Sequence, residues 1–122
     1  MNARRKSPDP DTILPLTTPA FHILLALADG ERHGYAIMRE VQERSGGAVR
    51  LGPGTLYGAI KRMLDQGVVE ETTDRPAPAE DDERRRYYRL TLFGRQVLAA
   101  EADRLEVLVR AVRSKRLRTR PT

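Results

Sequence analysis

The sequence predicts a mainly α-helical protein with a small β-hairpin. Two observations indicate this class. Four segments combine apolar patterns with helix start and stop signals, and two runs rich in β-branched and aromatic residues, VVEETT and YYRLTL, lie between the third and the fourth of them. A chain of 122 residues is long enough for one domain with a modest core and too short for two. We therefore expect one folded unit with tails.

The first helix is expected to run from Pro19 to about Ala28. Thr18 is a suitable cap for it, because threonine can accept hydrogen bonds from the free amides and proline suits the first helical position. The segment is apolar on nearly every side, so its own domain or a second subunit must surround it. Phe21 with Leu24 and Leu25 would either line a central pocket or form part of the core.

The second and third helices each have one apolar face. The second is expected over residues 34–45 with Gly46 as a left-handed stop, and the third over residues 53–66 with Gly67 closing it. The predicted inner face of the second helix consists of Ile37, Met38 and Val41, and that of the third consists of Leu56, Ile60, Met63 and Leu64. A short extended piece, residues 48–51, connects them.

The two β-runs predict a hairpin with a long tip. Between them lies DRPAPAEDDERRR, which is too rich in proline and charge for regular structure. An isolated two-stranded hairpin is only marginally stable in water, so it must pack on the helices. Tyr88 and Leu90 share one face and would supply that contact.

The last helix is expected from Leu92 to about Lys115, with Thr91 as its cap. A narrow apolar seam follows its length, of the kind that pairs with another helix. Its members are Leu98, Ala102, Leu105, Val109 and Val112, and Leu108 widens it. The other helices are too few to cover so long a stripe, which favours pairing between two copies of the chain. An intramolecular packing face is the alternative.

This order of elements, three helices and then a hairpin, is that of a winged helix, in which the third helix enters the DNA major groove. That arrangement explains why the third helix has glycine in its first turns. Gly54 and Gly58 would let the backbone approach a phosphate or a base edge closely, and the amides at the helix start favour anionic oxygens. The remaining outward or flanking residues supply hydroxyl groups and charge: Thr55, Tyr57, Lys61 and Arg62.

Each of these features also has a purely structural interpretation. Gly54 would then be a turn residue, Tyr57 a half-buried packing aromatic, and Lys61 with Arg62 an ordinary solvated face. Their coincidence on the third helix favours DNA. Next to the second strand, Arg84, Arg85 and Arg86 would meet phosphates, although the four acids that precede them would neutralise the cluster if they paired with it.

The excess positive charge lies at the two ends of the chain rather than in its middle. The net charge is +5, yet residues 13–112 carry 14 basic and 15 acidic side chains, so the excess comes from the ends. We expect a disordered basic tail over residues 1–15, a winged helix over 16–91, a dimerisation helix over 92–115 and a basic tail over 116–122. No segment has the length of a membrane span or the apolar region of a signal peptide, which predicts a cytoplasmic protein that does not contact membranes.

No constellation of residues indicates catalysis, a metal or a cofactor. The chain has no cysteine and no phosphate-binding loop, and Gly52, Gly54 and Gly58 depart from the dinucleotide-binding spacing. His22 and His33 are far apart in sequence without a nearby pair of carboxylates, which favours structural histidines. We therefore expect a protein that is not an enzyme.

Three segments, ERHGYAIMREV, LGPGTLYGAIKRMLDQGVVEE and RRRYYRLTLFGRQVL, together resemble the PadR-like transcriptional regulators, across about residues 17–112. The resemblance implies a homodimer that binds double-stranded DNA at a roughly two-fold symmetric operator, with the C-terminal helix at the dimer interface. It assigns Thr55, Tyr57, Lys61 and Arg62 to the recognition helix and Arg84, Arg85, Arg86 and Tyr88 to the wing. His33, Gly34 and Tyr35 match the motif at the start of the second helix.

The single C-terminal helix resembles the short branch of this family. Gly58 is a departure, because many members have proline there, and it loosens the start of the helix. Some relatives bind aromatic compounds at the dimer interface, so a small-molecule effector is a further expected partner, with Phe21 and Leu24 at that interface. Repression by occupying a promoter is the expected output. The alternative is a dimeric winged helix that binds protein rather than DNA.

Overall fold

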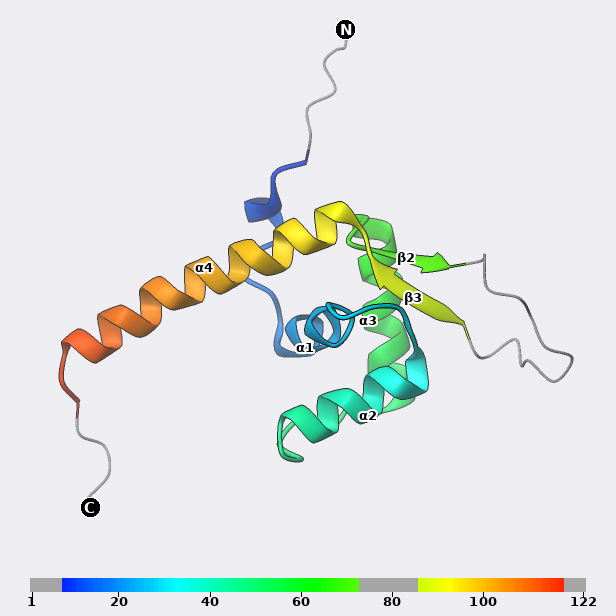
Figure 1. The fold of residues 1–122 in the computed structure, drawn as a ribbon, viewed down its shortest axis with the longest axis horizontal. Helices are drawn as coiled ribbons and strands as arrows, with labels where there is room; N and C mark the ends of the chain where they lie inside the picture. The colour runs from blue at the N-terminus through cyan, green and yellow to red at the C-terminus, as the bar shows by residue number, and fades with distance from the viewer. Residues whose placement is uncertain (1–7, 73–85, 118–122) are drawn as a thin grey trace, which may run out of the picture.

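The computed structural model describes residues 8–72 and 86–117. Four α-helices and a small antiparallel sheet form the winged-helix fold (Figure 1). The elements are, in chain order, the 3-10 helix η1 (Pro10–Ile13), α1 (Thr18–Ala26), β1 (Arg32–His33), α2 (Gly34–Arg44), α3 (Pro53–Gln66), β2 (Val69–Thr72), β3 (Tyr87–Leu90) and α4 (Leu92–Ser114).

Local end signals account for most helix bounds. Gly67 ends α3 in the left-handed conformation, with φ of 78°, and the Thr91 hydroxyl caps α4 by accepting from the amide of Gly94 at 2.9 Å. The predicted bounds of α3 and α4 are confirmed to within a residue. The prediction for α1 was wrong at both ends, because Thr17 and not Thr18 is the cap and the helix ends at Ala26.

The sheet has three strands rather than the two predicted. β3 is central and pairs with β2 on one side and with β1 on the other, in the order β1-β3-β2. In β1, Arg32 lies opposite Tyr88, and His33 lies opposite Tyr87. This short strand fixes the wing directly to the start of α2. The tip of the predicted hairpin, residues 73–85, lies outside the described residues.

The core lies where α1, α2 and α3 meet the sheet and the start of α4. Its fully buried side chains include Ile23, Leu24, Leu27, Ile37, Val41, Leu56, Ile60, Val68, Val69 and Val97. Leu64 was predicted to face this core, but its side chain is 36% exposed, and Ala59 is buried instead. The inner face of α3 is therefore narrower than predicted.

The start of α4 is packed directly on the backbone between α3 and β2. A Cβ atom at Gly94 would lie 2.9 Å from the carbonyl carbon of Val68, so no larger residue fits there without a shift. The Thr91 amide donates to the Val68 carbonyl at 3.1 Å, and the Thr91 hydroxyl donates to the Gly67 carbonyl at 2.6 Å. These contacts fix the direction in which α4 leaves the domain.

Residues 8–15 were expected to belong to a disordered tail, but they fold against α4. Asp9 caps η1 by accepting from the amide of Asp11 at 3.0 Å, and Ile13, Leu14 and Leu16 pack at the edge of the core. The first seven residues of the predicted tail lie outside the described residues. The folded domain consequently begins earlier than its sequence suggested.

A buried carboxylate fastens this N-terminal segment to α4. Glu101 is only 2% exposed; its Oε2 accepts from the Leu16 amide at 3.1 Å and its Oε1 lies 2.6 Å from Nε of Arg104. The hydrogen bond from Arg104 and that from Leu16 hold the pKa of Glu101 below its ordinary value, although burial opposes them. We call this group of three residues the Glu101 clasp.

Removing the clasp should destabilise the fold measurably. Glu101→Ala is expected to lower the free energy of unfolding by about 1–3 kcal/mol, because the Leu16 amide loses its partner in a partly buried site. Urea denaturation measures this. Glu106→Ala is the matched control, since Glu106 pairs with Arg110 on the exposed side of the same helix, and it should change stability by less than about 0.5 kcal/mol. Equal losses in the two variants would contradict the clasp.

The clasp also predicts a pH dependence. Because the folded pKa of Glu101 lies below its ordinary value of 4.5, the stabilisation by the ionised carboxylate is fully present above about pH 4.5 and is lost as the pH falls through the folded pKa. The difference in unfolding free energy between the wild type and Glu101→Gln should therefore shrink on acidification. Denaturation curves at a series of pH values test this, and a constant difference would contradict it.

Candidate nucleic-acid interface

The outward side of α3 is a ridge with little side-chain bulk. At 3.6 residues per turn, Gly54, Gly58, Lys61 and Asp65 lie opposite the buried residues of this helix. A Cβ atom at Gly54 would meet nothing within 4 Å, and one at Gly58 would meet only a guanidinium nitrogen of Arg62 at 3.9 Å. Packing thus does not require either glycine. We call Gly54, Gly58, Lys61 and Asp65 the α3 ridge.

Different groups flank the ridge on its two sides. Thr55 and Arg62 lie on one side and are exposed, and Arg62 also lines a cavity of about 100 Å³ beneath the N-terminal segment. Tyr57 lies on the other side and is 39% exposed. The Thr55 hydroxyl, the Arg62 guanidinium and the Lys61 ammonium therefore lie on the same surface as the ridge.

The start of α3 has no side-chain cap. Gly52 occupies the cap position without a side chain, and Pro53 has no amide hydrogen to donate. In contrast, Thr17, His33 and Thr91 cap α1, α2 and α4 with side-chain atoms. The amides of Gly54 and Thr55 consequently have no side-chain acceptor, and such amides favour an anionic oxygen.

The residues before α2 hold that helix against the sheet. Nδ1 of His33 accepts from the Ala36 amide at 3.1 Å, which requires an imidazole without a proton on that nitrogen. The His33 ring meets the ring of Tyr87 edge to face, with centroids 5.3 Å apart. Gly34 is buried, whereas Tyr35 is 63% exposed and points away from the core. The motif at the start of α2 thus combines a cap, a close contact and a surface aromatic.

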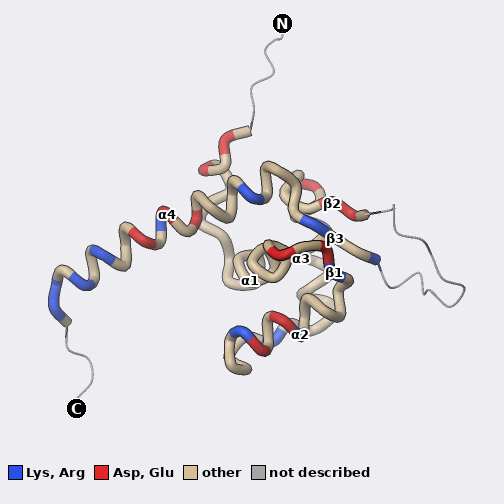
Figure 2. Tube along the Cα trace, viewed as in Figure 1, with Lys and Arg blue, Asp and Glu red and all other residues tan. Residues whose placement is uncertain are grey.

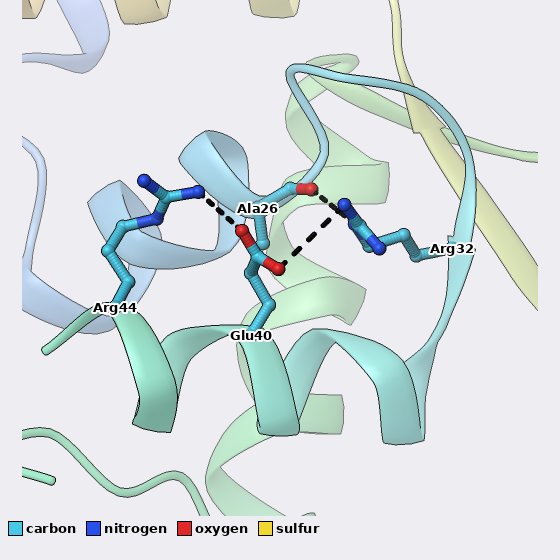
Figure 3. Close-up of polar contacts among 4 residues, drawn as sticks. All are labelled: Ala26, Arg32, Glu40 and Arg44. Carbon is cyan, nitrogen blue, oxygen red and sulfur yellow. Dashed lines mark hydrogen bonds and ion pairs between the residues drawn. The ribbon is translucent and has the colours of Figure 1, made fainter. Parts of the chain in front are cut away.

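A second polar group ties α1 to α2 (Figure 3). Nε of Arg32 donates to the carbonyl of Ala26, the last residue of α1, at 2.8 Å, and its guanidinium lies 3.8 Å from the Glu40 carboxylate. Arg44 pairs with the other oxygen of Glu40. Arg32 therefore satisfies a carbonyl at the end of α1 while β1 holds its backbone in the sheet.

The described part of the wing carries charges of both signs. Arg89 pairs with Glu70 at 2.7 Å, and Arg86 lies 3.7 Å from Glu71 across the two strands. Arg86 is exposed, and Arg84 and Arg85 lie outside the described residues. The acids of β2 therefore offset part of the positive charge on β3, as the neighbouring red and blue segments show (Figure 2).

The burial of Tyr88 contradicts the prediction that it contacts DNA from the wing. Tyr88 is 5% exposed and belongs to the core. Burial, followed by the nearby Glu71 and Tyr57, raises the pKa of its hydroxyl, and Arg86 opposes this shift. Residues alternate across a strand, and the face shared by Tyr88 and Leu90 points inward, as the hairpin prediction required.

The predicted dimer-interface residues divide between core and surface. Leu24 is fully buried in its own domain, so that prediction was wrong for it, while Phe21, Leu98 and Leu105 are half-buried. Ala102 is exposed. The far half of α4 extends away from the domain (Figure 1), and its apolar side chains Val107, Leu108, Val109 and Val112 are 45–62% exposed. A groove of about 240 Å³ lies along Leu105, Leu108, Val109, Val112 and Arg113.

Two kinds of site are absent from the described part of the chain. Over residues 8–72 and 86–117 there is no group of three or more histidines and carboxylates that can hold a metal ion. Within the same ranges, no helix has both the length and the apolar character that a membrane span requires.

A winged helix with an open α3 ridge and a long final helix that carries an apolar seam defines the class of this protein. Residues 23–100 match the transcriptional regulator PadR-like family, and the chain belongs to this family. It is 36% identical over 91 residues to the transcriptional regulator Rv3488 of Mycobacterium tuberculosis, covering 75% of this chain and 78% of that protein.

Two further comparisons extend this result. The chain is 44% identical over 80 residues to an uncharacterized 37.1 kDa protein in transposon TN4556 of Streptomyces fradiae, covering 66% of this chain but only 21% of that protein. The chain thus spans about a fifth of that relative. The crystal structure of Bacillus subtilis PadR in complex with operator DNA has the same fold, with a TM-score of 0.59 and 24% identity over 88% of this chain and 51% of that one.

Proposed function

We propose that this protein is a homodimeric repressor that occupies a pseudo-palindromic operator with α3 in the major groove. The α3 ridge is the observation that carries the proposal. Gly54 and Gly58 lack side chains where no packing contact requires glycine, so the helix backbone can approach the floor of the groove. The complex of Bacillus subtilis PadR with operator DNA supports DNA binding by this fold.

The charged and polar groups around the ridge have separate roles in this proposal. The free amides at the start of α3 bind a phosphate oxygen, and Lys61 and Arg62 neutralise phosphates or donate to base edges. Thr55 supplies a hydroxyl group at the rim of the contact. Arg86, with Arg84 and Arg85, supplies positive charge from the wing to the flanking backbone.

Dimerisation through α4 follows from its exposed apolar seam. Leu105, Leu108, Val109 and Val112 line one groove that nothing in the described chain covers. A second copy with the same seam would bury it on both sides. Two winged helices joined in this way place two recognition helices on one face of DNA about one helical turn apart, which is why the operator should be pseudo-palindromic.

We place a small-molecule effector in a hollow of about 550 Å³ between the N-terminal segment and α4. Its volume lies within the usual range for ligand pockets. Apolar and charged side chains line it: Asp11, Leu14, Pro15, Ala100, Asp103, Arg104 and Val107. A ligand there would contact both the Glu101 clasp and α4. By moving α4 it would change the relative position of the two DNA-binding domains.

The recognition-helix assignment predicts the effect of removing two charges. Lys61→Ala with Arg62→Ala should abolish preferential binding to a duplex obtained by selection from random DNA. It should also reduce the slope of log affinity against log salt by about 3.6 for the dimer, if each of the four residues removed neutralises one phosphate. Fluorescence anisotropy at several salt concentrations measures both. Arg110→Ala with Lys115→Ala removes the same charge from the far half of α4 and should leave the preference intact.

Two results would contradict this assignment. The first is unchanged, preferential binding by the Lys61 and Arg62 double variant. The second is wild-type binding that is insensitive to salt or absent, which would favour the protein-binding alternative because phosphate contacts always release counterions.

The apolar seam of α4 predicts that polar substitutions in it will dissociate the dimer. Leu108→Asp with Val112→Asp should convert a dimer into a monomer of 13.8 kDa, with helix content retained because both side chains are already exposed. The dissociation constant should rise at least about 100-fold, since two apolar side chains lose their buried positions. Analytical ultracentrifugation measures it. Val107→Asp, on the same helix but away from the seam, is the control, and equal dissociation by both variants would contradict the assigned seam.

A further inference from the structure

Gly34, like Gly94, is a glycine because a neighbouring group leaves no room for a side chain. It is buried at the start of α2, and its backbone does not adopt a positive φ, unlike Gly30, Gly46, Gly47 and Gly67. The conformation at this position is therefore open to any residue. Space is the constraint: a Cβ atom there would lie 2.8 Å from Cζ and 3.0 Å from Cε1 of Tyr57, and closer still to the Tyr57 hydroxyl oxygen.

The end of the Tyr57 side chain, its hydroxyl oxygen with the adjoining ring edge, thus occupies the place where a side chain of α2 would otherwise stand. Tyr57 belongs to α3 and lies on its flank, beside the α3 ridge. Contact between the ring edge and Gly34 brings the start of α2 and the second turn of α3 together. Since Gly34 adjoins His33, whose backbone pairs with Tyr87, the same contact lies next to the sheet.

The start of α2 is itself joined to the strand that supports the wing. The backbone of His33 pairs with that of Tyr87 in β3, and the two rings meet edge to face with centroids 5.3 Å apart. Tyr88 is paired with Arg32 of β1 and Glu71 of β2 in the sheet. The contact of Tyr57 with Gly34 therefore lies one residue away from the pairing of β1 with the strand that supports the wing.

We propose that Tyr57 is a positioning residue whose ring, seated against Gly34, sets how α3 is oriented relative to α2 and the wing, and so how the α3 ridge meets DNA. This inference rests on the proposed DNA-binding function. It assigns the importance of Tyr57 to its ring rather than to a hydroxyl contact with phosphate. It also explains why α2 begins with glycine.

A set of variants separates the ring from the hydroxyl. Tyr57→Phe keeps the ring and should bind the selected duplex within about threefold of the wild type, whereas Tyr57→Ala and Gly34→Ala should each lose at least about tenfold. The double variant should bind no worse than Tyr57→Ala within about threefold, because without the ring an alanine fits at position 34. Leu64→Ala, two turns along the same flank of α3 and exposed, is the matched control.

A measurement without DNA tests the same contact. The chain has four tyrosines and no tryptophan, so its near-ultraviolet circular dichroism reports on tyrosine packing. Gly34→Ala and Tyr57→Ala should lose the same part of this signal while the far-ultraviolet spectrum is retained. A merely structural role would lower stability without this shared loss and without a change in the ratio of affinities for the selected and a scrambled duplex.

The possible results distinguish failure of the positioning role from failure of the proposed DNA-binding function. Equal loss of affinity in Tyr57→Phe and Tyr57→Ala, or losses that add in the double variant, would overturn the positioning role while leaving DNA binding in place. Wild-type protein without preference for the selected duplex would instead overturn the proposed function. In that case the tyrosine signal of Gly34→Ala still decides whether the ring is seated on α2.

Discussion

Burial of one face of α3 is the constraint on which the rest of the structure depends. Leu56, Ala59, Ile60 and Met63 pack inward, so the positions opposite them must face solvent, and two of those are glycines. The same packing places the uncapped start of the helix on the surface. It also brings Tyr57 to the start of α2, while Gly67 turns the chain directly into the sheet. The open ridge thus follows from how the core is filled.

The sequence specified those elements whose signals are local and repeated. The bounds of α3 and α4 follow from Pro53, Gly67 and Thr91, each of which acts on the residues next to it in the chain. The sequence did not predict β1 because two residues are too few for a strand pattern, and it pairs with β3, more than fifty residues later. The segment that includes residues 8–15 is joined to α4 by the hydrogen bond from the Leu16 amide to Glu101, a contact between distant parts of the chain that periodicity cannot reveal.

The candidate site was predictable in its residue types and less so in its geometry. The glycines, hydroxyl groups and cations of α3 were found from helical spacing, whereas the burial of Tyr88 and of Leu24 required knowing which surfaces meet. The strand alternation that placed Tyr88 beside Leu90 on the packing face was in fact the signal that it does not reach DNA. Nothing in the sequence pattern linked Gly34 to Tyr57, because that contact depends on how two helices pack against each other.

The most direct test of the central claim is to locate the DNA contact on the protein. Backbone amide chemical shifts recorded as a selected duplex is added report every amide at once. We expect the largest changes in residues 53–62, led by Gly54 and Thr55, with further changes near Arg86, and little change in the far half of α4. Largest changes on the outer face of α2 or along the α4 seam, with residues 53–62 unaffected, would contradict the account.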